Sequence, residues 1–264
     1  EKSKKDIDHA VIYSCIMNNL FSYSNNRWGE KSVLEWTSIP KFLKMYEDSQ
    51  AIHIIRDPRD VLASRKYMTI APGKQYLDTI FNCMHSMQCA IKYKTQLPSD
   101  RYLLISYEEL ILQKEKTTKK IFKFLKEEFY DDLIEYENLI DNKGEALSVN
   151  THSSYSDTNP NNLIGRWREK LDSEDIMLTQ LLLKNYMKNF HYEIDQNYNN
   201  SNDSKIAEKV FEDDVLLKKR WLNYKKTGEG VEDFTNDPTD PENWVKRSGI
   251  DGKGAGKGYK KFKT

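Results

Sequence analysis

Two short apolar runs along the chain have the length and composition of buried β-strands. The first is Ala51-Ile-His-Ile-Ile55, and the second is Tyr102-Leu-Leu-Ile-Ser106. Between them, residues 74–96 repeat apolar side chains at the helical spacing and stop before a proline. The order strand, helix, strand is typical of a parallel sheet, so we expect neighbouring parallel strands with Arg56 and Tyr107 at one sheet edge.

Amphipathic patterns predict further helices on both sides of these strands. The expected helices are one within residues 1–30, a short one ending near Tyr46, a Lys-rich one over 114–127, one over 172–190 and a basic one over about 205–226. Residues 141–165 are rich in turn-forming side chains, so we expect a loop there. Residues 249–264 combine many glycines and lysines with little apolar surface, so we expect them to be disordered.

The length of 264 residues suits one main α/β domain with an appendage. We expect this domain over residues 1–198. A C-terminal extension over residues 199–264 then holds the basic helix and the Gly/Lys tail.

The charge balance excludes a strong overall attraction to polyanions. The chain has 41 Lys and Arg residues and 41 Asp and Glu residues, so its formal net charge is zero. Any anion site must therefore be local, and we expect no nucleic-acid partner. Three cysteines lack metal-binding spacing, and no apolar run approaches the ~20 residues of a membrane span. We expect neither a metal site nor a membrane segment in this chain.

Candidate chemistry begins where the first strand ends. Arg56 follows the strand, Asp57 and Pro58 suit the start of a helix, and Ser64 stands two turns into it. Ligands of open α/β sheets bind at such strand ends, and a helix N-terminus beside a guanidinium favours a phosphate. The alternative is a strand-end arginine paired with Asp60, a third-position acidic cap residue, and an ordinary helical serine.

This segment resembles the 3'-phosphate-binding motif of sulfotransferases, enzymes that use 3'-phosphoadenosine 5'-phosphosulfate (PAPS), whose arginine and serine match Arg56 and Ser64. Three further stretches resemble the lysine segment of tyrosylprotein and bacterial sulfotransferases, their tyrosine-containing strand end and their closing cofactor segment. These stretches are Trp28-Gly-Glu-Lys31, Ser106-Tyr-Glu-Glu-Leu110 and Gly165-Arg-Trp-Arg168. The resemblance implies a P-loop-type sulfotransferase fold, an α/β fold with a parallel sheet flanked by helices.

The resemblance also implies roles for individual residues. Lys31 is the expected catalytic residue, because a lysine can stabilise the charge that builds on the bridging oxygen during sulfuryl transfer. Tyr107 is expected to contact the nucleotide. Ser153, Ser154 and Arg166 are expected to close over the 3'-phosphate. The alternatives are a solvated surface lysine and a buried strand-end tyrosine.

One part of the family pattern is not found in the sequence. Relatives begin with a strand and a Gly-rich loop that holds the 5'-phosphosulfate, whereas Gly29 is the only glycine within residues 1–50. Because the sequence starts at Glu1 and not at Met, we expect an N-terminal truncation that removes the first strand and this loop. No histidine has a matching context for a catalytic base, and Glu30 beside Lys31 is only a weak candidate.

The resemblance therefore predicts a sulfotransferase that moves a sulfuryl group from PAPS to a hydroxyl or amine acceptor, incomplete as given. The alternative is a non-catalytic nucleotide-binding or scaffold module of the same fold. The acceptor stays open between a carbohydrate, a peptide tyrosine and a small metabolite, because acceptor loops vary on a fixed scaffold. Few cysteines favour the cytoplasm, whereas sequons at Asn199 and Asn202 would matter in a Golgi-type lumen.

Overall fold

The computed structural model describes residues 9–20, 27–67, 73–134, 164–196 and 203–229. The predicted tail over 249–264 and all but the last two residues of the predicted loop over 141–165 lie outside these residues. The chain divides into two compact units, residues 1–31 with 232–264, and residues 32–231. None of the helices in the described part of the chain is both long and apolar enough to cross a bilayer.

The smaller unit contains helix α1 (His9–Leu20), as the pattern in residues 1–30 predicts. The Tyr13 ring packs edge-on against Trp28, with ring centroids 5.3 Å apart. The Tyr13 hydroxyl also donates a hydrogen bond to the Glu30 carboxylate. These contacts connect the helix to the stretch that ends at Lys31.

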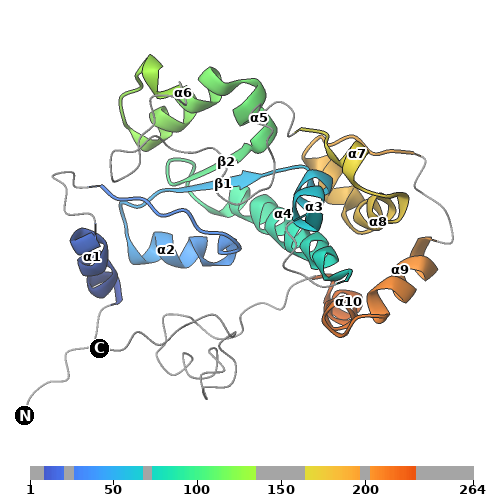
Figure 1. Ribbon diagram of the computed structural model, residues 1–264. Coiled ribbons are helices and arrows are strands. Elements are labelled where there is room, and N and C mark those ends of the chain that lie inside the picture. Colours follow the sequence, from blue (N-terminus) through green and yellow to red (C-terminus); the bar gives the residue numbers. More distant parts are fainter. Residues whose placement is uncertain (1–8, 21–26, 68–72, 135–163, 197–202, 230–264) are drawn as a thin grey trace, which may run out of the picture. The chain divides into compact units, whose positions relative to one another are not determined.

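The larger unit is built on two parallel strands, β1 (Ala51–Ile55) and β2 (Tyr102–Ser106), which run side by side in Figure 1. In this register Ala51 lies opposite Tyr102, and Ile55 lies opposite Ser106. The prediction of neighbouring parallel strands is therefore confirmed. Arg56 and Tyr107 follow at the same sheet edge, where the Arg56 guanidinium carbon lies 4.4 Å from the centre of the Tyr107 ring.

Helix α4 (Asp78–Gln96) covers the face of the sheet that carries His53. The His53 Nε2 atom lies 2.9 Å from Ser86 Oγ of this helix, and its Nδ1 atom lies 2.9 Å from the Tyr102 hydroxyl. Tyr93 of α4 packs edge-on against Tyr102. Burial lowers the pKa of His53 to about 4, so the ring is neutral near pH 7. His53 is therefore a buried core residue.

The prediction that β1 is a buried strand is wrong at Ile54, whose side chain is 49% exposed. Successive side chains of a strand point to opposite faces, so Ile54 points away from the face of His53 and Ile55. An apolar run shows that a strand is rich in β-branched side chains. It does not show whether a second helix layer covers the other face.

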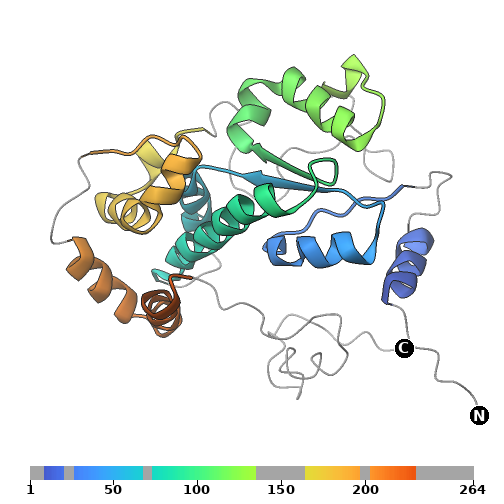
Figure 2. The ribbon, with the colours of Figure 1, turned by 180° about the vertical axis from the view of Figure 1, so that it is seen from behind.

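The remaining helices of the larger unit are α2 (Ile39–Met45), α3 (Pro58–Tyr67), α5 (Tyr107–Leu112), α6 (Lys114–Leu125), α7 (Trp167–Lys170), α8 (Ser173–Asn189), α9 (Asp203–Glu212) and α10 (Val215–Thr227). Most of them flank the strands, while α9 and α10 lie farther out and contact α8 and α4, as Figures 1 and 2 show. Short 3₁₀ helices cover Trp36–Ser38, Gln75–Leu77 and Asp131–Ile134. One apolar cluster contains side chains from six helices, namely α3, α4, α7, α8, α9 and α10. Its fully buried members include Leu62, Phe81, Leu183 and Phe211.

The single basic helix predicted over about 205–226 is wrong, because the structure has two helices, α9 and α10, in this region. The break lies before Asp214, whose carboxylate accepts the backbone amides of Leu216 at 2.8 Å and Leu217 at 3.1 Å. An aspartate that caps a new helix competes with continuation of the preceding one. Phe211 and Trp221 place both helices in the core, while the domain division at residue 198 stays a prediction.

Candidate functional site

The candidate site lies where β1 passes into α3. Asp57 is the N-cap of α3, because its Oδ1 atom accepts the backbone amide of Arg59 at 2.9 Å. Pro58 occupies the first helical position, where a missing amide hydrogen costs nothing. The helix therefore begins immediately after the strand, which places Arg56 at the N-terminus of α3. Ser64 is half-buried on the same helix.

The predicted capping role of Asp60 is wrong, because its carboxylate faces a distant segment of the chain. Its Oδ2 atom accepts the Gly165 amide at 2.7 Å, and its Oδ1 atom accepts the Trp167 amide at 3.0 Å. The amide of Asp57, which a capping box would have paired with Asp60, donates instead to Glu108 Oε1 at 2.9 Å. Asp60 thus fastens residues 165–167 to the first turn of α3.

Asp60 is only 2% exposed, so its carboxylate is removed from solvent. Burial raises the pKa of this carboxyl group. The amides of Gly165 and Trp167 and the positive charge of Arg56 act in the opposite direction. Both carboxylate oxygens accept a backbone amide. The positive charge of Arg56 is close enough to stabilise the ionised form of Asp60.

Arg166 lies between the two amides that Asp60 binds. Its backbone therefore stands beside the first turn of α3, and its side chain is half-buried. Arg56 approaches the same turn from β1. Two arginines that are 110 positions apart in sequence thus border one helix N-terminus, whose dipole also favours an anion.

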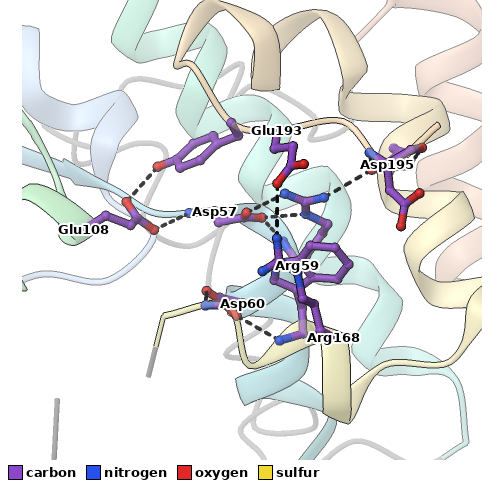
Figure 3. Close-up of polar contacts among 11 residues, drawn as sticks. Asp57, Arg59, Asp60, Glu108, Arg168, Glu193 and Asp195 are labelled. Atoms are coloured by element: carbon purple, nitrogen blue, oxygen red, sulfur yellow. Dashed lines mark hydrogen bonds and ion pairs between the residues drawn. The ribbon is translucent and has the colours of Figure 1, made fainter. Parts of the chain in front are cut away.

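Arg59 supports this arrangement from within the protein, where its side chain is 1% exposed. Its Nη2 atom lies 2.7 Å from Asp57 Oδ2, and its Nη1 atom donates to Gln180 Oε1 at 3.1 Å (Figure 3). Its guanidinium carbon lies 3.9 Å from the centre of the Trp167 ring. A buried ion pair with further hydrogen bonds and a stacked ring holds α3, α7 and α8 together.

Glu108 connects the end of β2 to the same network (Figure 3). While its Oε1 atom accepts the Asp57 amide, its Oε2 atom accepts the Tyr192 hydroxyl at 3.0 Å. Burial and the neighbouring Glu108 carboxylate raise the pKa of Tyr192. The tyrosine therefore stays protonated and acts as a hydrogen-bond donor.

Tyr107 is half-buried, and its ring faces the Arg56 guanidinium. This stacking limits the orientations of a side chain that is otherwise flexible. Cys83 is electrostatically coupled to Arg56 and Asp57, but burial raises its pKa to about 12. A thiol with such a pKa is not a nucleophile near neutral pH. Within the described ranges, no group of side chains could hold a metal ion.

The structure brings together Arg56, Tyr107 and the backbone of Arg166, and it places Ser64 on α3. Lys31 belongs to the smaller unit, where its side chain is exposed. Ser153 and Ser154 lie outside the described residues. The ligand-binding and catalytic roles of all these residues stay predictions.

Sequence reasoning missed three supporting residues, namely the amide-binding role of Asp60, the buried guanidinium of Arg59 and the bridging carboxylate of Glu108. Charged residues next to a helix start read as solvated or capping residues in a sequence.

Comparisons with known proteins agree with this architecture. The model of the Sulfotransferase family matches residues 5–132, which include Lys31, Arg56, Ser64 and Tyr107. A solved structure, described as the sulfotransferase domain from the curacin biosynthetic pathway, is similar with a TM-score of 0.50 and 18% sequence identity. The similarity covers 70% of this chain and 69% of that one. Among curated proteins, none matches the chain. Residues 5–132 therefore match the Sulfotransferase family, and the parallel strands with their flanking helices have the fold of a sulfotransferase domain.

Proposed function

We propose that the protein transfers a sulfuryl group from PAPS to a hydroxyl or amine acceptor. The observation that carries this proposal is the convergence of Arg56 and the backbone of Arg166 on the N-terminus of α3. In this proposal the two arginines and the Ser64 hydroxyl hold the 3'-phosphate of the nucleotide. The guanidinium groups provide bidentate donors, and the helix N-terminus adds its dipole.

The residues present fit a phosphate ligand in chemistry and in preorganisation. Arg56 is stacked on Tyr107, so less side-chain entropy is lost when it binds an anion. Tyr107 itself offers a ring and a hydroxyl to the nucleotide. Ser153 and Ser154 are proposed to close over the phosphate together with Arg166.

Lys31 is the proposed catalytic residue. PAPS supplies an activated sulfuryl group, which leaves its phosphate oxygen and bonds to the acceptor oxygen or nitrogen, while the acceptor loses a proton. A lysine ammonium stabilises negative charge on the oxygen that is left behind. The proposed acceptor is a carbohydrate, a peptide tyrosine or a small metabolite.

Calorimetry with adenosine 3',5'-bisphosphate and the full chain tests the nucleotide site. Arg56→Ala should weaken binding by about 2–3 kcal/mol, because a charge-assisted contact is lost. Ser64→Ala should cost about 1 kcal/mol, because only a neutral hydroxyl is lost. Lys120→Ala, which removes an exposed positive charge from α6, is the charge-matched control and should bind like the wild type.

The 2'-phosphate isomer separates a shaped site from a generally positive surface. Equal binding of the two isomers, or unchanged binding by Arg56→Ala, would contradict the proposed site. A transfer assay with PAPS and Lys31→Ala then separates catalysis from binding. Loss of transfer with retained nucleotide binding is expected. Nucleotide binding without transfer would identify the non-catalytic module only if a longer chain that supplies the Gly-rich loop also transfers no sulfuryl group.

A further inference from the structure

One buried carboxylate connects two segments that are far apart in the sequence. Asp60 in the first turn of α3 accepts the amides of Gly165 and Trp167 at 2.7 Å and 3.0 Å. With 2% exposure, Asp60 is closed to solvent, and both of its oxygens already have a backbone donor. Its carboxylate is therefore used for holding the chain and not for receiving a ligand.

The two amides flank a single residue, Arg166. A peptide unit fixed on each side restricts the backbone torsions of the residue between them, and with them the direction of its side chain. Gly165 makes the tight turn that this requires, because its φ of +75° is in the left-handed region that favours glycine. A Cβ atom at this position would lie 2.8 Å from Arg168 Nη1.

Asp60 carries a negative charge close to a site that is proposed to bind a negatively charged phosphate. A carboxylate without hydrogen-bond donors at this place would repel the phosphate and counteract the attraction of Arg56 and Arg166 for it. Two amide donors and the positive charge of Arg56 stabilise this negative charge and oppose the effect of burial on the pKa of Asp60. The carboxylate can therefore hold Arg166 in place at little electrostatic cost to an anion.

We propose that Asp60 is the positioning residue for Arg166. By binding the amides on both sides of Arg166, it holds this residue beside Arg56, so that both arginines can bind the same phosphate. Asp60 does not touch the nucleotide and acts only through Arg166. This inference rests on the proposed function. The inference adds Asp60 to the proposed site. Removal of its carboxylate should weaken the contact that Arg166 makes with the nucleotide.

The test is a double-mutant cycle of Asp60→Asn and Arg166→Ala, measured by calorimetry with adenosine 3',5'-bisphosphate. Asparagine has the size of aspartate but can accept only one of the two amides, and its own NH₂ group faces the other. Each single variant should weaken binding about tenfold. The double variant should bind no more weakly than Arg166→Ala alone, because Asp60 has no effect once its target is removed.

Asp214→Ala is the matched control. Asp214 also accepts two backbone amides, those of Leu216 and Leu217, but it caps α10. This variant should lower the melting temperature and leave the affinity for the bisphosphate unchanged. A general loss of stability therefore cannot imitate the expected result, since it would lower affinity in both aspartate variants.

The outcomes distinguish this inference from the proposed function. No binding of the bisphosphate by the wild type would contradict the proposed function itself. If the wild type binds the bisphosphate and Arg56→Ala weakens this binding, the proposed function stands. Additive losses of affinity from Asp60→Asn and Arg166→Ala would then overturn only the positioning role of Asp60. So would unchanged binding by either single variant.

Two measurements do not depend on the folding of Asp60→Asn. Hydrogen exchange on the wild type should show protected amides at Gly165 and Trp167 before any nucleotide is added. Exchange at the rate of an unstructured chain would overturn the inference. Arg166→Ala in an otherwise unchanged chain must also weaken binding, and an unchanged affinity would be equally decisive.

Discussion

Acid should destabilise this protein through His53, and the size of the effect follows from its surroundings. The ring is 6% exposed, and burial lowers its pKa from 6.5 to about 4. Between these pH values the unfolded chain binds a proton that the folded chain does not, so stability is lost as the pH falls below 6.5. The complete effect is about 3 kcal/mol, of which about 2 kcal/mol is lost by pH 5.

The hydrogen bonds of His53 are not the cause of this loss. Its ring nitrogens face the hydroxyl groups of Tyr102 and Ser86. A hydroxyl group accepts as well as donates, so both contacts can persist when the ring is protonated. The cost arises from placing a positive charge between the sheet and α4.

Urea unfolding followed by circular dichroism at pH 8, 7, 6 and 5 measures this contribution. His53→Gln should be less stable than the wild type at pH 8. Between pH 8 and pH 5, however, it should lose about 2 kcal/mol less than the wild type loses. The control is His191→Asn, which removes an exposed histidine at a φ of +61° that asparagine tolerates. The control should keep the wild-type pH dependence, and the same pH dependence in His53→Gln would refute this reasoning.

Two further variants test the packing around the site. Gly165→Ala forces a side chain into the left-handed region and against Arg168, so it should cost about 1–2 kcal/mol and weaken bisphosphate binding; an unchanged melting temperature would contradict the described turn. Phe211→Ala removes a fully buried ring of α9 and should cost about 3–5 kcal/mol. Val215→Ala, at a position that is 90% exposed on α10, should change stability by less than about 0.5 kcal/mol. Equal effects of these last two variants in chemical denaturation would show that α9 is not part of the core.

Short-range features of this protein could be predicted from the sequence because their causes are neighbours along the chain. The β-branched runs at 51–55 and 102–106 become the two strands, and Asp57 with Pro58 starts α3 immediately after the first of them. Asp172 caps α8 by accepting the Asp175 amide, again within one turn. The parallel pairing also followed, because a helix between two strands carries the chain back to the same end of the sheet.

The candidate site was predictable in part for the same reason. Arg56 and Tyr107 each follow a strand, so parallel pairing was enough to bring them to one edge. The break at Asp214 was missed although its cause is local. A capping aspartate within an amphipathic pattern is easily read as one more polar residue of a continuous helix.

The sequence by itself thus determined the two strands, their parallel order, the start of α3 and the arginine at the end of β1. Only the tertiary structure decided which charged residues are buried and which distant groups they contact. Asp60 selects amides 105 and 107 positions away, and Arg59 pairs with Asp57 while it contacts Gln180 and Trp167. The physical reason is that a charge enters the interior only where several donors or acceptors converge on it, and that convergence depends on packing between distant segments. The exposure of Ile54 was also decided by packing, because Ile105, its partner on the same face of the sheet, is 1% exposed while Ile54 is 49% exposed.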